Sequence, residues 1–145
     1  MDNGEHFTES KTPFMTITTT VWKKDHEFVS HLDDHSIKID GSRKNGYGPK
    51  ALLLAGLAGC SGIDVVDILK KMRIEFSDFS IETKAAQTDE NPKVYKDIHI
   101  CYKMKTDKVN EDKIRKAIEL SLEKYCGVAA MLRKNSEIIY ALQIL

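Results

Sequence analysis

The segment from Pro49 to Arg73, PKALLLAGLAGCSGIDVVDILKKMR, restricts the possible folds of this chain more than any other stretch. Between Ala51 and Gly59 it contains no polar side chain, and a helix without polar side chains has no face suited to water. Charged residues follow from Asp64 onward, so the apolar run is too short and too interrupted for a membrane span. The segment therefore predicts a central helix that is buried on every side, with Cys60 near its middle.

The residues around Cys60 are unusually small and include Gly56, Gly59 and Gly62. Each glycine inside a helix costs about 1 kcal/mol relative to alanine. Small residues allow a substrate or another backbone to come close to the sulfur. Tight packing of helices in a dense core explains the same residues equally well, and this stretch alone does not separate the two interpretations.

Hydrophobic patterns before this helix predict strands. Residues 14–22 are rich in Thr, Ile and Val, and residues 26–32 and 36–40 form two further short runs separated by turn-like residues. These three segments predict an antiparallel meander. The glycine-rich residues 41–48, GSRKNGYG, predict a loop that leads into Pro49.

After Arg73 the sequence predicts two strands, a second helix and a last strand. Residues 76–83 predict a strand, and residues 94–105 alternate between apolar and polar side chains, which is typical of a half-buried strand. An amphipathic helix follows, with Asn110 as its N-cap and Cys126 at its C-terminal end. Residues 136–145 predict a last strand.

The predicted order is βββ-α-ββ-α-β, without βαβ alternation. This order indicates an α+β fold with mostly antiparallel sheets around a long buried central helix. No repeat or linker interrupts the pattern, so we expect a single domain over residues 1–145. Residues 1–13 are polar and are expected to form a frayed terminus.

Composition narrows the class of partner and the compartment. The 22 basic and 22 acidic residues balance, so charge gives no reason to expect nucleic acid or a membrane as partner. Three cysteines are too few for a disulfide framework. We also expect no secretory signal. Together these two expectations favour a cytoplasmic protein with one or two reactive thiols. The histidines show no zinc-binding spacing, and we expect neither a metal nor another cofactor.

The cysteines are the candidate reactive groups. If both predicted helices pack on the same face of a sheet, Cys60 and Cys126 approach one another, and a disulfide needs Cα atoms about 4.4–6.8 Å apart. Such a pair suits a thiol peroxidase cycle that passes through a sulfenic acid and a disulfide. A free cysteine is also commonly a small buried apolar residue, so both interpretations stay open. Cys101 lies on the polar face of its strand, and we interpret it as an incidental surface thiol.

Two motifs, GPKALLLAGLAGCSGIDV and LSLEKYCGVAAML, resemble the OsmC/Ohr family of osmotically inducible proteins C and organic hydroperoxide resistance proteins. The run AxxLSxEKYC is more similar to the OsmC-like branch. The resemblance extends from about Phe14 to Leu145. It implies an intertwined homodimer with two interfacial active sites, a reactive Cys60, a resolving Cys126, an organic hydroperoxide substrate and a thiol or dithiol reductant.

The sequence departs from the family pattern beside Pro49. Family members stabilise the thiolate with an arginine from the preceding loop, held by a glutamate just after the proline. Here Lys50 takes that place, and Arg43 is the only arginine of the loop. An ammonium near Cys60 would favour the thiolate, but it cannot hold an arginine as a carboxylate does. Arg43 is therefore the candidate thiolate partner, with a solvated loop charge as its alternative role.

These residues support three hypotheses of function. The first is a thiol-dependent peroxidase that uses Cys60 and Cys126. The second, motivated by the missing glutamate, is a binding protein of the same fold that holds an apolar small molecule with weak or no peroxidase activity. The third is a purely structural or interaction protein, which leaves the two cysteines in small-residue surroundings unexplained.

Asp64, one helical turn beyond Cys60, is expected to point to a polar neighbour or a partner chain.

Overall fold

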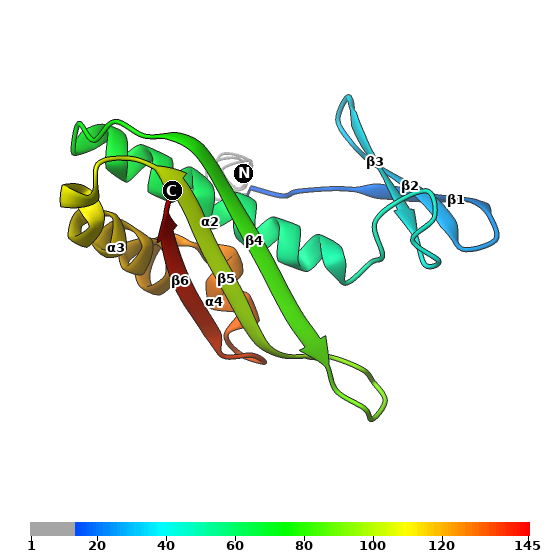
Figure 1. Ribbon diagram of the computed structural model, residues 1–145. Coiled ribbons are helices and arrows are strands. Elements are labelled where there is room, and N and C mark those ends of the chain that lie inside the picture. The colour runs from blue at the N-terminus through cyan, green and yellow to red at the C-terminus, as the bar shows by residue number, and fades with distance from the viewer. Residues whose placement is uncertain (1–13) are drawn as a thin grey trace, which may run out of the picture. The chain divides into compact units, whose positions relative to one another are not determined.

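The computed structural model describes residues 14–145, and the frayed terminus predicted for residues 1–13 lies outside this range. The chain divides into two compact units, one ending at Pro49 and one spanning Lys50–Leu145. The predicted α+β class and the order of the main elements are confirmed (Figure 1). The single domain over residues 1–145 stays a prediction, and each unit is described by itself.

The first unit is an antiparallel meander of β1 (Thr19–Lys24), β2 (Glu27–Leu32) and β3 (His35–Asp40). Its two tight turns contain Asp25 and Asp33, whose φ angles are 46° and 51°. Aspartate adopts this left-handed region more readily than most residues, because its short side chain can bond locally. The predicted meander is therefore present, but its first strand begins at Thr19 and not at Phe14.

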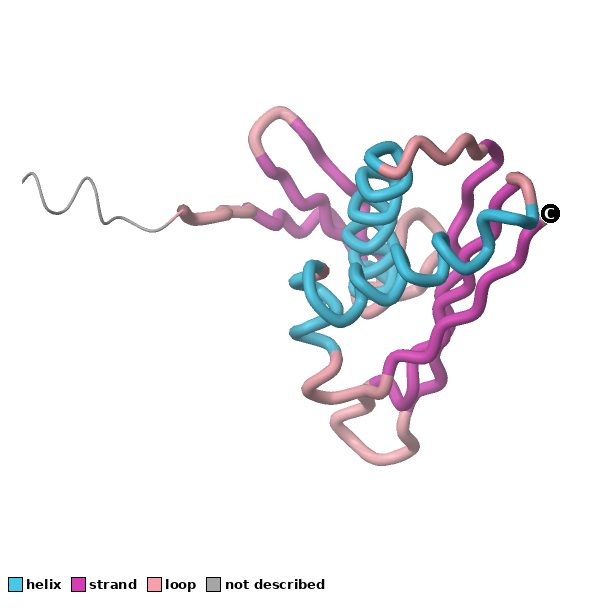
Figure 2. The backbone as a smooth tube through the Cα atoms, turned by 90° about the vertical axis from the view of Figure 1, so that its left-hand side faces the viewer, coloured by secondary structure: helices cyan, strands magenta, loops and turns pink. Residues whose placement is uncertain are grey.

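The second unit packs helices against one face of a three-stranded sheet. The sheet has the order β4-β5-β6 and consists of β4 (Ser77–Gln87), β5 (Tyr95–Lys105) and β6 (Ile138–Ile144). Figure 2 shows the helices together on one side of this sheet. They are α2 (Ala51–Lys71), the 3₁₀ turn η1 (Lys108–Asn110), α3 (Glu111–Leu120), the π-helical turn η2 (Ser121–Tyr125) and α4 (Gly127–Leu132).

The core lies between these helices and β5. As the alternation predicted, one face of β5 is buried, and its fully or almost fully buried side chains are Ile98, Ile100, Tyr102 and Met104. The opposite face carries His99, Cys101 and Lys103, none of which is buried. Burying one face of an alternating strand against helices removes its apolar side chains from water and leaves the polar ones solvated.

Helix α2 departs from the prediction that it is buried on every side. Only the stripe of Leu57, Ser61, Val65 and Leu69 is fully buried, whereas Ile63 on another face is 65% exposed. The cause is geometric, because one sheet and one layer of helices cover only part of a cylinder. By length and composition α2 also qualifies as a possible membrane span, as core helices of soluble proteins do.

The last strand pairs in parallel, whereas the other pairs of named strands are antiparallel, as the predicted mostly antiparallel fold allows. β6 pairs with β5 in parallel, with Ile98 opposite Ile138 and Met104 opposite Ile144. The connection between them contains η1, α3, η2 and α4. A connection of this kind returns the chain to the starting end of β5, so the next strand enters in the same direction.

The start of α3 also differs from the prediction. Asn110 precedes α3 but makes no side-chain capping bond. Asp107 instead caps the preceding turn η1, and its carboxylate accepts a hydrogen bond from the amide of Val109 at 3.0 Å. The 3₁₀ turn thus moves the capping function three residues toward the N-terminus.

Candidate active site

Cys60 lies in the middle of α2, where it is half-buried and packs against the core. Its small neighbours do not all serve packing. A Cβ atom added at Gly56 or Gly59 would meet nothing within 4 Å, whereas one at Gly62 would lie 3.1 Å from Ile81. Tight packing within this chain therefore explains Gly62 alone. The other two glycines, both of which precede Cys60, leave open space along α2.

Cys126 follows the π-helical turn η2 and is almost fully buried. Its amide donates a hydrogen bond to the carbonyl of Ser121 at 2.7 Å, which closes the wider π-helical ring. Its sulfur accepts a hydrogen bond from the amide of Ala129 at 3.3 Å, in the first turn of α4. Single π-helical turns inside helices are frequent at functional sites. Here the turn separates two helices and leaves Cys126 in extended backbone between them.

Cys60 packs against the buried cluster that contains Cys126, close enough to affect the Cys126 thiol. The pKa of the Cys126 thiol is raised to about 11, chiefly by burial and next by a hydrogen bond with the Cys60 thiol, against the opposing effect of the Ala129 amide. The structure thus brings together the two cysteines that helix packing was expected to bring together, and both are free thiols. With this pKa, Cys126 carries its proton at neutral pH and is the natural donor toward the Cys60 sulfur.

A buried hydrogen-bonded network lies next to the thiol pair. The Tyr102 hydroxyl lies 2.5 Å from Ser61 Oγ, and Ser61 Oγ lies 2.8 Å from Ser121 Oγ. Ser121 Oγ also bonds Asp64 Oδ2 at 2.9 Å. Asp64 thus points to a polar neighbour, as expected. Tyr102, Ser61 and Ser121 are fully buried, and every buried side-chain polar atom among residues 14–145 has a partner.

Sequence reasoning did not assign a role to Ser61, Ser121 or Tyr102. Each occupies a position that the hydrophobic pattern reserves for an apolar residue: Ser61 in the stripe of α2, Ser121 in the stripe that continues α3, and Tyr102 on the core face of β5. Buried polar side chains are nearly always hydrogen-bonded. Three such residues on core-facing positions were the available signal of a shared network.

Lys50 forms hydrogen bonds at the end of the sheet. Its ammonium donates hydrogen bonds to the Gln87 side chain and, at 2.9 Å, to the carbonyl of Lys93. Both acceptors belong to the end of β4 and the loop that follows it. The Lys50 ammonium thus ties the start of α2 to the sheet.

Arg43 lies in the other unit, in the loop after β3, with a φ angle of 61°. Asp40 holds this loop, because its carboxylate accepts hydrogen bonds from the amides of Ser42 and Asn45 at 2.8 and 2.9 Å. The bond from the Ser42 hydroxyl is the main reason why the pKa of Asp40 is lowered. The loop is thus ordered by its own contacts, and the approach of Arg43 to Cys60 stays a prediction.

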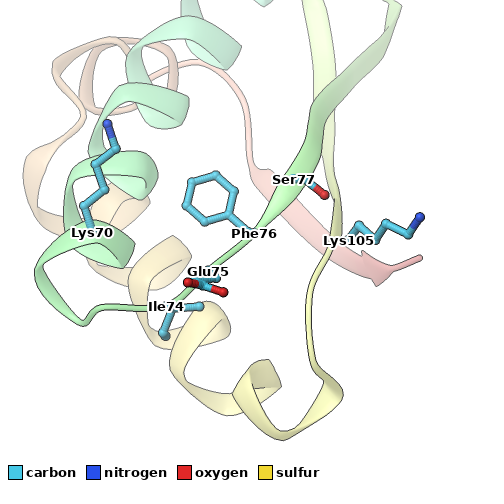
Figure 3. A pocket seen from close by; sticks show the side chains of 6 residues that line it. All are labelled: Lys70, Ile74, Glu75, Phe76, Ser77 and Lys105. Atoms are coloured by element: carbon cyan, nitrogen blue, oxygen red, sulfur yellow. The ribbon is translucent and has the colours of Figure 1, made fainter.

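The second unit has two cavities near α2. One of about 430 Å³ opens beside Asp64 and is lined by Asp64, Asp67, Ile68, Lys71, Met72, Leu120 and Tyr125. A second, of about 620 Å³, lies at the C-terminal end of α2 (Figure 3) and is lined by Lys70, Ile74, Glu75, Phe76, Ser77 and Lys105. Neither of these two cavities is lined by a cysteine, so we assign the thiol chemistry elsewhere. Among the described residues no three His, Cys, Asp or Glu side chains are grouped to hold a metal.

Comparison with known proteins gives consistent matches. A family model described as OsmC-like protein matches residues 40–141. Protein YhfA of Escherichia coli strain K12 is 32% identical over 111 residues, which cover 76% of this chain and 83% of YhfA.

Two solved structures extend these matches. A hypothetical protein from Aquifex aeolicus VF5 is 29% identical with a TM-score of 0.78, covering 92% of this chain and 99% of that chain. The organic hydroperoxide resistance protein OhrB of Bacillus subtilis has a TM-score of 0.62 and 21% identity, covering 90% and 98%. The second likeness is one of fold.

Proposed function

This chain belongs to the family of OsmC-like proteins, and on that basis we propose that it is a thiol-dependent peroxidase that reduces organic hydroperoxides. Cys60 is the attacking thiol and Cys126 the resolving thiol. Solved proteins of the same fold are named organic hydroperoxide resistance proteins, which supports this substrate class. The observation that carries the proposal is the proximity of the two thiols: Cys60 of α2 packs against the buried cluster that contains Cys126, and it contributes to the raised pKa of Cys126.

The first step consumes the peroxide. The Cys60 thiolate attacks one peroxide oxygen, the O–O bond breaks, and the alcohol leaves with one proton, which gives a Cys60 sulfenic acid. Cys60 is only half-buried, and the helix positions of Gly56 and Gly59 before it have open space. We assign Arg43 as the cation that stabilises the thiolate.

The second step forms the disulfide. The Cys126 sulfur attacks the Cys60 sulfur, the S–O bond breaks, and the hydroxyl leaves as water with the Cys126 proton. Because its pKa is raised, Cys126 stays protonated until the sulfenic acid forms, and its own proton then neutralises the leaving hydroxide. A thiol or dithiol reductant returns both cysteines to thiols and takes the disulfide bond onto itself.

We further propose that the working form is a cytoplasmic homodimer. From the start of α2 to Ile63 the exposed residues of the helix are apolar or glycine, and they include Leu53, which is 47% exposed. Large exposed apolar surfaces commonly mark a protein interface. A second copy of this chain supplies a matching apolar face, and the open positions at Gly56 and Gly59 permit close approach of the two helices.

The test is peroxide consumption together with intact mass. The native protein should consume an organic hydroperoxide rapidly when a dithiol is supplied, and the Cys60→Ser variant should not. One equivalent of peroxide should lower the mass by two hydrogen atoms, with peptide mapping to a Cys60–Cys126 bridge. Cys101→Ser is the matched control and should behave as native. Equal peroxide consumption by the native protein and Cys60→Ser removes the proposal.

A second candidate function follows from the position of Lys50. The residue after Pro49 is bound to Gln87 and to the Lys93 carbonyl, so no carboxylate at this place holds Arg43. A protein of the same fold that binds an apolar small molecule, with weak or no peroxidase activity, fits this feature. Native mass spectrometry should then show a small molecule that co-purifies with the protein. An empty and peroxide-active protein contradicts this alternative.

A further inference from the structure

Ser121 connects the two cysteine-bearing segments. It begins the π-helical turn η2, five residues before Cys126, and its side chain is fully buried. Its hydroxyl reaches across to α2 and lies 2.8 Å from Ser61 Oγ and 2.9 Å from Asp64 Oδ2. Ser61 is the residue after Cys60, and Asp64 follows Cys60 by one helical turn. One side chain thus contacts α2 immediately beside the attacking cysteine.

The protons of this network have one consistent arrangement. A carboxylate only accepts, so Ser121 donates to Asp64. Ser61 then donates to Ser121, and Tyr102 donates to Ser61 across 2.5 Å. Burial raises the pKa of Tyr102, which therefore keeps its proton. Because each hydroxyl both donates and accepts, η2 can hold only one position along α2 without leaving a buried polar group unsatisfied.

Backbone hydrogen bonds couple the position of η2 to that of Cys126. The carbonyl of Ser121 accepts the Cys126 amide at 2.7 Å, and the guanidinium of Arg133, in the residue after α4, donates to the carbonyl of Leu122. The side chain of Ser121 is therefore fixed to α2, and its backbone is fixed to the residue whose sulfur meets Cys60. The distance between the sulfurs depends on this connection.

We infer that Asp64, Ser61 and Ser121 are positioning residues that hold Cys126 against Cys60 for disulfide formation. The role of these residues in peroxide turnover rests on the proposed function. Their role in holding Cys126 close to Cys60 does not. In any oxidation of this pair two S–H bonds break, one S–S bond forms, and two electrons and two protons pass to the oxidant. The network raises the effective concentration of the Cys126 thiol at Cys60, and it leaves the rate at which Cys60 attacks peroxide unchanged.

The decisive measurement is the effective concentration of Cys126 at Cys60. The reduced protein is equilibrated in buffers of reduced and oxidised glutathione, where oxidised glutathione takes up the two electrons and two protons, and the fraction with a Cys60–Cys126 bridge is read by mass. We expect Ser121→Ala to lower this effective concentration about tenfold, the order of the net contribution of a hydrogen bond to a charged acceptor. Asp64→Ala should lower it similarly, and it supplies the same readout if Ser121→Ala does not fold.

The matched control is Ser136→Ala. Ser136 is also buried, and its hydroxyl bonds the carbonyl of Tyr95 at 3.1 Å, away from the thiol pair. Its loss should lower the stability without changing the effective concentration. If Ser121→Ala and Asp64→Ala stay within twofold of native, or if Ser136→Ala falls as far as they do, the inference is overturned.

A peroxide experiment separates the inference from the proposed function. In single turnover with an organic hydroperoxide, Ser121→Ala should form the Cys60 sulfenic acid at the native rate but the disulfide about tenfold more slowly, with more sulfinic acid. A native protein that does not react with peroxide refutes the proposed function alone, because the glutathione equilibrium still reports the positioning. A slower first step with an unchanged second step refutes the positioning.

Discussion

Replacing Ile63 by Asp tests whether the exposed side of α2 faces a second copy of the chain. Ile63 is 65% exposed, and complete burial of such a side chain contributes about 1.5–3 kcal/mol. Covering the exposed part therefore contributes about 1–2 kcal/mol per copy. In a two-fold symmetric dimer the same residue counts twice, so the dimer loses about 2–4 kcal/mol. This loss corresponds to a rise of about 30- to 1000-fold in the dissociation constant.

The assay is sedimentation over a concentration series, for the native protein and for Ile63→Asp. Val109→Asp is the matched control, because Val109 is 80% exposed in the turn η1 and not on α2. We expect a native dimer, a Val109→Asp dimer of the same affinity, and dissociation of Ile63→Asp at concentrations where the others stay paired. A native protein that is monomeric throughout, or equal effects of both substitutions, would refute the reasoning.

Two further predictions concern Cys126 and Gly46. The pKa of the Cys126 thiol is about 11 in the folded protein, against 9.0 for an ordinary thiol. The free energy of unfolding of the native protein, relative to that of Cys126→Ala, should therefore stay constant below about pH 9 and fall as the pH rises toward 11. Urea titrations at several pH values measure this difference, and a difference that does not change with pH contradicts the assigned burial. A Cβ atom at Gly46 would lie 2.7 Å from the carbonyl oxygen of Lys38, so Gly46→Ala should destabilise the first unit by about 1–3 kcal/mol. Faster hydrogen exchange in β2 and β3 is the expected sign, and unchanged exchange there contradicts it.

Local patterns in the sequence were sufficient to predict most elements. The alternation along β5 identified its buried face, and the long apolar run identified α2, because both signals come from residues close together in the chain. The turn chemistry between β2 and β3 was equally local. In each case the physical preference of neighbouring residues agrees with the final structure.

The features that were missed depend on distant parts of the chain. The apolar run of α2 shows that the helix must be buried by other residues, but it does not show whether they belong to this chain or to another. The parallel entry of β6 depends on where a long helical connection ends. Ser61 lies 60 residues from Ser121 and 41 from Tyr102, so no short pattern indicates that their hydroxyls meet. The position of Cys126 depends on the π-helical turn, which helix periodicity does not distinguish from an ordinary helical turn.

The parallel pairing of β6 also affects how the protein is made. β5 lies in the middle of its sheet, yet the ribosome synthesises α3, η2 and α4 before the strand that completes it. During this interval the nascent chain presents a bare edge of β5, and unpaired edges are templates for aggregation. Cys126 is translated before that edge closes, so its thiol emerges while the sheet beneath it is unfinished. The sheet is therefore completed only after both Cys60 and Cys126 have been synthesised.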